Sequence, residues 1–228
     1  MPRSCTFSLP GQDFTLDQLD HPLDLDQLLP GSGEWEVELG FGKGRFLLRS
    51  ALENPDRRFL GIELVSKYYR LLLDRSRRRG LHNLAVVRGE ALYLLATVLP
   101  KGFASRLHVY FPDPWHKAKH NKRRMFDPET LDLMLGLLRP DGELLFASDY
   151  LEYGDLVIEM LENHPNLDVE QIHEPWPDGA RTNYEAKFMR EGRPIRRLRA
   201  RRKPQPAPLG DVHPRGEAGI LAAWAKSE

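Results

Sequence analysis

The chain has 228 residues and equal numbers of acidic and basic residues, 33 of each, so its formal net charge is zero. Hydrophobic residues make up 41% of it, which is normal for a protein that buries a core, and the length fits one large domain with an appendage. No apolar run is long enough to cross a membrane, no secretory signal is expected, and the single cysteine, Cys5, excludes an internal disulfide and a cysteine-built zinc site. We therefore expect a cytoplasmic protein with no membrane and no metal partner.

Zero net charge argues against a nucleic-acid partner only if the charges are evenly spread, and they are not. Residues 1–40 contain eight acidic residues and one basic residue, whereas residues 57–79 contain eight basic and two acidic residues. Residues 117–124 hold five basic residues, and residues 193–203 hold seven, with no acidic residue in either block. Each basic block is either a solvated face or a surface that contacts phosphate.

Residues 1–33 are polar and are predicted to form an N-terminal arm that ends at a Pro-Gly-Ser-Gly break. After the arm, strand-like and helical patterns alternate. In chain order they are strand 35–39, helix 43–53, strand 59–64, helix 66–79, strand 84–87, helix 91–99, strand 107–111, helix 127–139, strand 143–148, helix 150–163 and strand 167–172. This alternation predicts an α/β fold with a mainly parallel sheet and helices on both faces.

Local signals mark several of these boundaries. Ser66 is a suitable N-cap and Gly80 a suitable stop for one helix, and Asp127 with Pro128 fits the start of another. A proline-rich spacer at residues 203–208 precedes a predicted short helix at 217–226. We therefore expect an arm over residues 1–33, an α/β domain over residues 34–192, and a basic C-terminal extension over residues 193–228.

A glycine-rich turn follows the first strand and opens a helix. Gly40, Gly42 and Gly44 let the backbone turn tightly and let a ligand approach closely. Their G-x-G-x-G spacing differs from the G-x-G-x-x-G of dinucleotide binders, and no Lys-Ser or Lys-Thr of a Walker loop follows. Because Glu38 stands just before the turn, the site suits a ligand with an ammonium group and no pyrophosphate, such as S-adenosylmethionine.

Acidic residues stand at or just after the ends of five predicted strands, where ligands of open α/β sheets bind. These residues are Glu38, Glu63, Glu90, Asp113 and Asp149. Glu63 lies about 20 residues beyond the turn, where an acidic side chain usually receives ribose hydroxyls. Glu90 also suits a cap of the helix that follows it.

The fourth strand runs into a Phe-Pro-Asp-Pro-Trp loop. Pro112 and Pro114 fix the backbone on either side of Asp113 and so hold its carboxylate near the strand end. Trp115 suits either stacking on a base or packing in the core. A carboxylate beside a methyl donor, with the basic block at residues 117–124 next to it, indicates a nucleic-acid substrate.

Four segments in this order, residues 38–44, 61–63, 111–124 and 182–185, closely resemble those of the bacterial tRNA (guanine-N7-)-methyltransferases, which methylate guanine-46 in the tRNA variable loop. The resemblance covers roughly residues 34–190. The Phe-Pro-Asp-Pro-Trp segment with its basic tail is close to diagnostic, whereas the glycine turn alone would mark only a class I methyltransferase. The resemblance implies a Rossmann-like methyltransferase domain with a seven-stranded sheet, methyl transfer from S-adenosylmethionine, and a tRNA substrate.

The resemblance also implies roles for residues at matching positions. Asp113 corresponds to the proposed active-site acid. The implied cofactor contacts are Glu38, Gly40, Gly42, Gly44, Glu63, Glu90 and Asp113. The implied substrate contacts are Lys117, Asp149, Thr182, Asn183, Tyr184 and Glu185. The implied RNA contacts are Lys119, His120, Asn121, Lys122, Arg123 and Arg124. Glu90, His116 and Ala118 depart from the residues that are common in the family at these positions.

Several alternatives remain at this point. An amino-group methyltransferase of the Asp/Asn-Pro-Pro-aromatic type requires a different order of residues around Asp113, and the glycine spacing disfavours an NAD-dependent dehydrogenase. A tRNA-binding protein without catalysis, or a methyltransferase acting on another nucleic-acid base, fits the same charge pattern. Residues 193–203 are either an additional tRNA clamp or an unpaired basic extension. The sequence predicts no particular protein partner.

Overall fold

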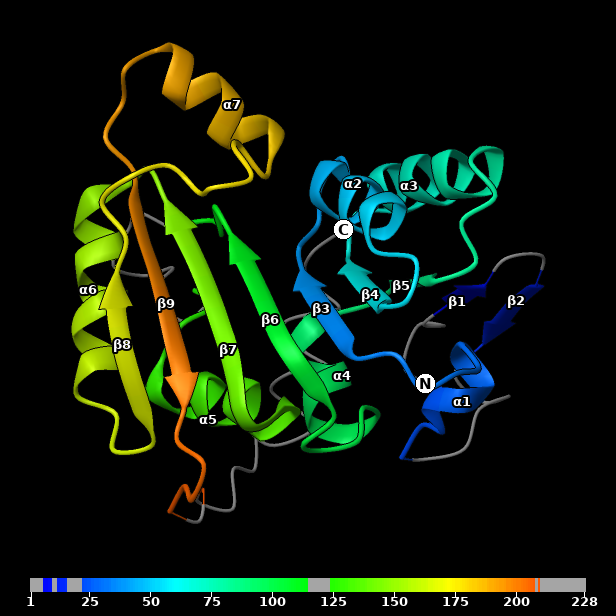
Figure 1. The fold of residues 1–228 in the computed structure, drawn as a ribbon, viewed down its shortest axis with the longest axis horizontal. Helices are drawn as coiled ribbons and strands as arrows, with labels where there is room; N and C mark the ends of the chain where they lie inside the picture. Colours follow the sequence, from blue (N-terminus) through cyan, green and yellow to red (C-terminus); the bar gives the residue numbers. More distant parts are fainter. Residues whose placement is uncertain (1–5, 10–11, 16–21, 115–123, 208, 210–228) are drawn as a thin grey trace.

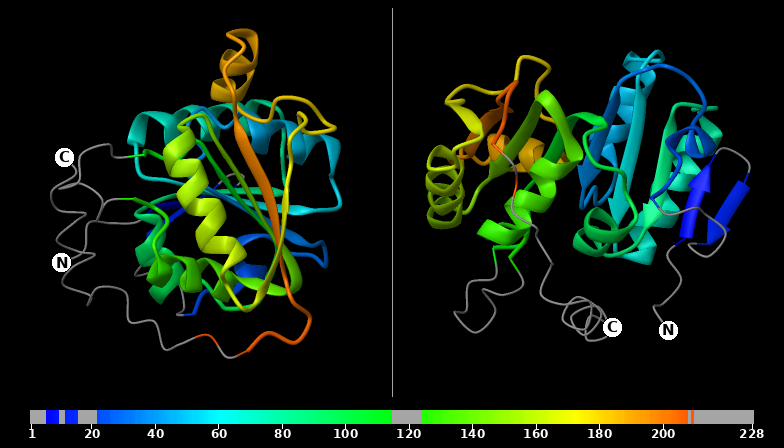
Figure 2. Two further views of the ribbon diagram at one scale, coloured as in Figure 1. Left: turned by 90° about the vertical axis from the view of Figure 1, so that its left-hand side faces the viewer. Right: turned by 90° about the horizontal axis from the view of Figure 1, so that it is seen from below.

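The computed structural model describes residues 6–9, 12–15, 22–114, 124–207 and 209, and Figure 1 shows their arrangement. The strands are β1 (Thr6–Leu9), β2 (Gln12–Thr15), β3 (Trp35–Leu39), β4 (Arg58–Glu63), β5 (Leu84–Arg88), β6 (Ala104–Tyr110), β7 (Leu138–Ser148), β8 (Leu167–Gln171) and β9 (Arg196–Arg202). They form a single mixed sheet in the order β2-β1-β5-β4-β3-β6-β7-β9-β8. The sheet is therefore the predicted Rossmann-like core, extended at one end by the β1–β2 hairpin (Figure 2).

The five central strands are parallel, and the direction in which the chain adds them reverses in the middle of the sheet. From β3 the chain adds β4 and then β5 on one side, and it then crosses to place β6 and β7 on the other side of β3. At such a reversal the connections after two neighbouring strands lead to opposite sides, which leaves a crevice at the carboxyl ends. The fold thus places the ends of β3 and β6 at the natural ligand site of an open α/β sheet.

Each face of the sheet has its own apolar core, because side chains alternate along every strand. The helices are α1 (Leu25–Leu28), α2 (Arg45–Glu53), α3 (Ser66–Arg78), α4 (Ala91–Thr97), α5 (Pro128–Leu137), α6 (Leu151–Glu162) and α7 (Asn183–Arg190). One core joins Val37 and Phe146 to apolar residues of α4, α5 and α6. The other core joins Phe59 and Val86 to apolar residues of α2 and α3. The prediction of helices on both faces is confirmed.

Several predicted helix boundaries are also confirmed. Gly80 adopts the left-handed conformation just beyond α3, with a φ of +62°. The side chain of Asp127 accepts a hydrogen bond from the amide of Thr130, and Pro128 occupies the first turn of α5. Ser66 differs from the prediction, because it is the first residue of α3 rather than its cap.

The structure corrects the predicted ends of the α/β domain. Within the expected arm, β1 pairs with β5 in antiparallel orientation, so part of residues 1–33 belongs to the sheet. Beyond residue 192, β9 lies between β7 and β8 and pairs antiparallel with both. The sheet therefore continues past the boundary that we expected at residue 192. The predicted helix at residues 217–226 lies outside the described residues.

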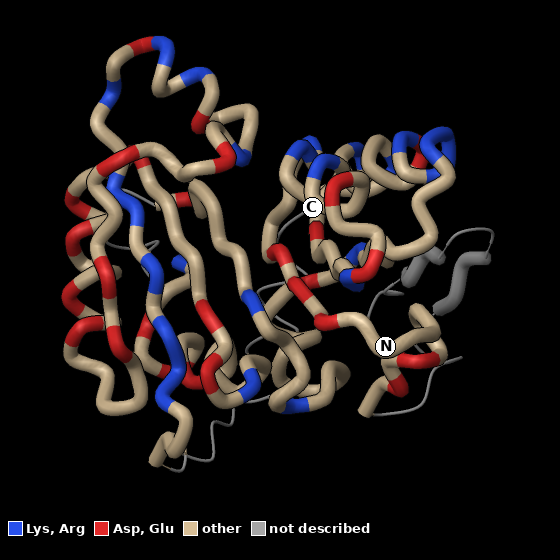
Figure 3. The backbone as a smooth tube through the Cα atoms, viewed as in Figure 1, with Lys and Arg blue, Asp and Glu red and all other residues tan. Residues whose placement is uncertain are grey.

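Most of the basic block at residues 193–203 forms the strand β9. Leu198 and Ala200, two residues apart, both face the core. This alternation is typical of a strand, but the arginines around it obscure it in the sequence. Arg199 lies 3.8 Å from Glu143 of β7 and 3.4 Å from Glu170 of β8, and Figure 3 shows basic β9 between acidic neighbours. All seven basic side chains of this block have protein partners; these partners are Asp149, Asp155, Glu185, Glu143, Glu170, Asp141, and the carbonyl oxygens of Leu138 and Pro165.

No helix in the described part of the chain is long and apolar enough to cross a membrane.

Candidate active site

Two of the predicted site residues stand at the carboxyl ends of the two strands between which the chain order reverses. Glu38 is near the end of β3, and Asp113 follows β6 by three residues. Because β3 and β6 are parallel neighbours, with Glu38 opposite His108, their carboxyl ends open at the same edge. Glu63, the last residue of β4, adds a third carboxylate at this edge. The fold therefore brings Glu38, Glu63 and Asp113 together from three segments of sequence.

Glu38 is a buried carboxylate with an unsatisfied oxygen. Its side chain is only 2% exposed, and its Oε2 has no hydrogen-bond partner among the described residues. Burial, assisted by the charge of Glu63, raises the pKa of Glu38 to about 8. Buried polar atoms in folded proteins are almost always paired, so an orphaned carboxylate oxygen at a strand end indicates a site for a donor from outside the chain.

Glu63 holds the glycine turn in place. Its Oε2 accepts a hydrogen bond of 2.9 Å from the amide of Gly42, and its Oε1 accepts one of 2.8 Å from the amide of Val65. Burial raises the pKa of Glu63, these amide bonds act in the opposite direction, and Asp113 adds a smaller upward contribution. Asp113 is thus close enough to Glu63 for the two charges to interact.

The glycine turn leaves open space beside its backbone. Gly40, Gly42 and Gly44 all have positive φ, at +71°, +53° and +69°. A Cβ atom added at Gly40 or Gly42 meets no atom within 4 Å, whereas one added at Gly44 meets Leu72 at 2.6 Å. The first two glycines thus border the crevice, and the third allows α2 to pack against α3.

Asp113 is exposed on a loop with a fixed shape. Phe111, two residues before Asp113, has a φ of +53°, which is uncommon for a bulky residue. Its amide donates a hydrogen bond of 2.7 Å to the carbonyl of Ala147. Arg124 donates from Nε to the carbonyl of Pro114 at 2.9 Å and lies 5.1 Å from the Tyr153 ring centroid. Arg124, one of the implied RNA contacts, therefore braces the loop that presents Asp113.

Helix α7 stands above the carboxyl ends of β6 and β7 (Figure 1) and contains most of the implied substrate segment. Thr182 is its N-cap, and its hydroxyl accepts the amide of Glu185 at 3.0 Å. Glu185 is fully buried: Oε1 accepts from Nε of Arg197 at 2.7 Å, and Oε2 accepts from the amide of Arg181 at 2.8 Å. Both of its oxygens are thus engaged inside the protein, while Asn183 and Tyr184 are exposed.

An aromatic cluster joins α7 to the Asp113 loop. The ring of Phe111 lies 5.6 Å from that of Phe188 and 6.4 Å from that of Tyr184, and Tyr184 stacks on Phe188 at 6.0 Å. Tyr184 remains 56% exposed, which is unusual for a large aromatic side chain that already has two ring neighbours. An exposed aromatic face beside the crevice is suited to stacking on a nucleic-acid base.

The remaining predicted residues fall into two groups. Asp149 follows β7 and forms an ion pair with Arg193, and Glu90 caps α4 by accepting the amide of Tyr93 at 2.6 Å. The position of Glu90 thus agrees with the alternative that we left open for it, a helix cap. Lys117 and the implied RNA contacts Lys119, His120, Asn121, Lys122 and Arg123 lie outside the described residues.

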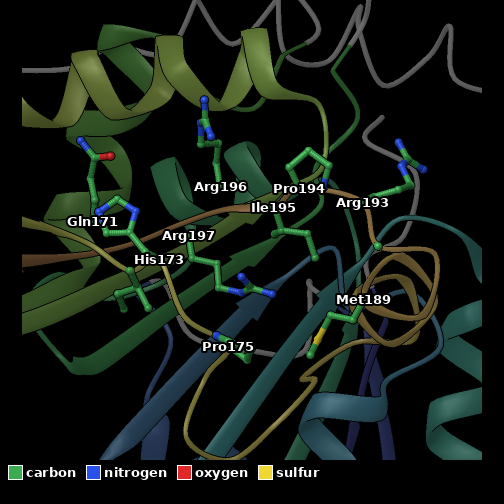
Figure 4. A pocket seen from close by; sticks show the side chains of 11 residues that line it. Gln171, His173, Pro175, Met189, Arg193, Pro194, Ile195, Arg196 and Arg197 are labelled. Carbon is green, nitrogen blue, oxygen red and sulfur yellow. The ribbon is translucent and has the colours of Figure 1, made fainter.

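A separate cavity of about 470 Å³ lies between β8, the start of β9 and the end of α7 (Figure 4). Arg193, Arg196 and Arg197 line it, but each of them forms an ion pair with a carboxylate of the protein. None of the three crevice carboxylates lines this cavity. This cavity is therefore separate from the three carboxylates at the strand ends.

Three arginines that organise the site were missed in the sequence. Arg181 binds Tyr110, Asp178 and the ring of Trp176, whereas Arg197 pairs with Glu185 and Arg193 with Asp149. The Thr-x-x-Glu pattern at residues 182–185 was a signal for the start of α7, because it matches a helix capping box. No local signal exists for the arginines, since their partners lie far away in the sequence.

Comparisons with known proteins agree with this geometry. The family described as "Putative methyltransferase" matches residues 33–198. A tRNA (guanine-N(7)-)-methyltransferase of Jannaschia sp. is 37% identical over 75% of this chain and 73% of its own length. One from Francisella philomiragia is 38% identical over 62% of each chain. Among solved structures, the 16S rRNA methyltransferase KamB has a TM-score of 0.60 at 15% identity, covers 87% of this chain and all of its own, and shares the fold. The chain belongs to the tRNA (guanine-N(7)-)-methyltransferase family.

Proposed function

We propose that this protein transfers a methyl group from S-adenosylmethionine to N7 of a guanine in tRNA, at position 46 of the variable loop. The observation that supports this most directly is the buried carboxylate of Glu38, which has an unpaired oxygen at the chain reversal beside the glycine turn. The proposal also rests on the relatives, although the chain spans just under two thirds of the Francisella protein. Because tRNA is its substrate, the enzyme acts in the cytoplasm.

The residues of the crevice fit S-adenosylmethionine. Oε2 of Glu38 would hold its α-ammonium group, because a cation at this point would lower the free energy of the ionised carboxylate that burial disfavours. Glu63 retains free lone pairs for ribose hydroxyls after accepting the amides of Gly42 and Val65. Gly40 and Gly42 leave room for close approach of the ligand. When bound, the cofactor supplies an electrophilic methyl group on a positively charged sulfur.

The protein residues have to align the guanine rather than activate it. Guanine N7 carries an in-plane lone pair, so the N7–carbon bond forms as the carbon–sulfur bond breaks, and no proton has to be removed first. Positive charge moves from the sulfur to the purine ring during this step. Asp113, exposed at the crevice, stabilises the charge on the ring, and Tyr184 offers a stacking face. Correct alignment contributes about 7–11 kcal/mol in favourable cases.

The described basic surface that fits the tRNA backbone is the outer side of α3. Lys67, Arg70, Arg77, Arg78 and Arg79 are exposed there, with Asp74 as the acidic exception. Arg75 links this surface to the glycine turn by donating to the carbonyl of Lys43. Arg78 forms an ion pair with Asp74, and the excess of basic over acidic residues gives α3 a net positive charge (Figure 3). We assign it, with the basic block at residues 117–124, to phosphate contacts that weaken as salt increases.

The deciding experiment is methylation of unmodified tRNA with a labelled methyl donor, followed by nucleoside analysis. We expect label in 7-methylguanosine, lost when guanine-46 is replaced. Asp113→Ala should abolish turnover while tRNA binding stays within about threefold, because the phosphate contacts lie elsewhere. Near-normal turnover in this variant would remove Asp113 from the mechanism.

The same experiment separates the alternatives. Label in a different nucleoside indicates a methyltransferase for another base. Tight tRNA binding without any labelled product indicates a binding protein that lacks catalysis. Binding of NAD rather than S-adenosylmethionine, seen as a thermal shift, would contradict the assignment of the glycine turn.

A further inference from the structure

A chain of four side chains runs under the active-site loop and connects β3, β6 and the segment before α7. His108 and Tyr110 lie two residues apart on the same face of β6, and Glu36 lies on the neighbouring β3. Nε2 of His108 is 3.0 Å from Oε2 of Glu36, and Nδ1 of His108 is 2.8 Å from the Tyr110 hydroxyl. Arg181 then donates from its guanidinium to the Tyr110 hydroxyl at 2.6 Å.

With the neutral imidazole that burial of His108 favours, the donors and acceptors of this chain run in one direction. Arg181 has no acceptor, so it donates to Tyr110, and the Tyr110 hydroxyl in turn donates to Nδ1 of His108. Nε2–H of His108 then donates to the carboxylate of Glu36. In this arrangement His108 is neutral, with its proton on Nε2. Burial lowers the pKa of His108, which agrees with the neutral form.

Both ends of the chain are fixed. At one end, Glu36 also receives Arg57 and Arg106. At the other end, the Arg181 guanidinium lies 4.1 Å from the Trp176 ring centroid and forms an ion pair with Asp178 at 3.1 Å. The backbone amide of Arg181 donates to Glu185 inside α7. A movement of Arg181 therefore moves the start of α7.

The two segments joined in this way are the two that surround the proposed guanine site. Tyr110 is the last residue of β6, and Phe111 and Pro112 are all that separate it from Asp113. Arg181 immediately precedes Thr182, the cap of the helix that presents Asn183 and Tyr184. The Tyr110–Arg181 hydrogen bond spans 71 residues of sequence and joins these segments through one buried and one partly buried side chain.

We propose that Arg181 and Tyr110 are positioning residues that set the Asp113 loop and α7 at the separation needed for methyl transfer. The inference rests on the proposed function. A displacement of about 1 Å at a reacting centre can reduce the rate about 100-fold. We therefore expect loss of this single bond to lower kcat strongly while the free energy of unfolding changes little. Neither residue needs to contact the substrate.

The test is a double-mutant cycle with Tyr110→Phe, Arg181→Met and the double variant. Tyr110→Phe removes only the hydroxyl. Ser105→Ala is the matched control, because it removes another buried hydroxyl from β6, at the opposite end of the strand, where Ser105 donates to the carbonyl of Trp35. Affinity for S-adenosylmethionine and for tRNA, measured by calorimetry and filter binding, should stay within about threefold in all variants.

We expect kcat to fall about 10-fold or more in each single variant, no further in the double variant, and not at all in Ser105→Ala. Amide hydrogen exchange should increase in both the Phe111 loop and residues 183–190 of Tyr110→Phe, and in neither segment of the control. Wild-type kcat with a lower Tm, or strictly additive losses, would overturn the proposal. The exchange measurement does not depend on the reaction, so it decides the coupling even if tRNA is not the substrate.

Discussion

Glu36 and Glu38 are two residues apart on β3, point to the same face of the sheet and are both buried, yet their environments are opposite. Glu36 is surrounded by Arg57, Arg106 and His108. Burial alone would raise its pKa, but the hydrogen bond from His108, followed by the charge of Arg106 and the hydrogen bond from Arg57, outweighs it and lowers the pKa to about 2. Glu38 has no such partners, and burial raises its pKa to about 8.

The difference distinguishes a carboxylate that stabilises the fold from one that is kept for a ligand. Every oxygen of Glu36 has a donor from the protein, so its removal affects folding. Oε2 of Glu38 has none among the described residues, so the free protein carries a cost that a bound cation relieves. Four predictions test this contrast, in order of decreasing effect.

The largest effect is expected for Glu36→Ala. Removing one member of a buried, charged network leaves the charges of its partners uncompensated. We expect the free energy of unfolding to fall by about 3 kcal/mol. This value is at the low end for buried ion pairs, because Arg57 and Arg106 keep partial contact with water. Urea denaturation measures this change. Affinity for S-adenosylmethionine should stay within about threefold; a large loss of affinity with normal stability would reverse the contrast.

Glu38→Gln should lower the affinity for S-adenosylmethionine without lowering the stability. Loss of a charge-assisted hydrogen bond worth about 2–3 kcal/mol predicts a rise in the Kd for S-adenosylmethionine of about 30- to 150-fold. Stability at pH 8 should not fall, because the variant no longer places an ionised carboxylate in the core. Calorimetric titration and thermal unfolding of the same samples give both quantities. Unchanged affinity would show that Glu38 does not bind the ammonium group.

The pH dependence of stability should separate the two residues. The pKa of Glu36 is lowered, so its contribution is present above pH 4.5 and is lost as the pH falls toward 2. The pKa of Glu38 is raised, so its contribution is present below pH 4.5 and is lost as the pH rises through 8. Each slope is at most about 1.4 kcal/mol per pH unit. Glu36→Gln should flatten the acid limb of the wild-type profile and Glu38→Gln the alkaline limb.

The smallest effect is expected for Gly42→Ala. This variant places a methyl group in the open space beside the glycine turn, where we expect the ligand to bind, and changes no charge. A left-handed alanine costs about 1–2 kcal/mol of stability. Gly80→Ala is a matched control, with a φ of +62° and equally open surroundings at the far end of α3. Both variants should lose similar stability, and only Gly42→Ala should bind S-adenosylmethionine more weakly. Equal affinities would place the ligand away from the turn.

The contrast between Glu36 and Glu38 also shows how far sequence reasoning reached. Glu38 was predicted because a glycine turn and a strand end are local patterns. The chain from Glu36 to Arg181 was not predicted, because it depends on the register of β3 against β6 and on a contact 71 residues away. Likewise, β9 was taken for an extension because five arginines obscured the alternation of Leu198 and Ala200. Patterns close in sequence were readable, whereas pairings between distant segments were not.

The position of β9 has a consequence for the synthesis of the protein. Among the described strands, β9 comes last in the sequence but lies between β7 and β8. The ribosome therefore releases β7 with one edge open, and that edge is completed only after residue 202 emerges. Arg197, which holds Glu185 at the start of α7, arrives at the same moment. A nascent chain therefore contains Glu38 and the glycine turn well before the strand that holds Glu185 in place.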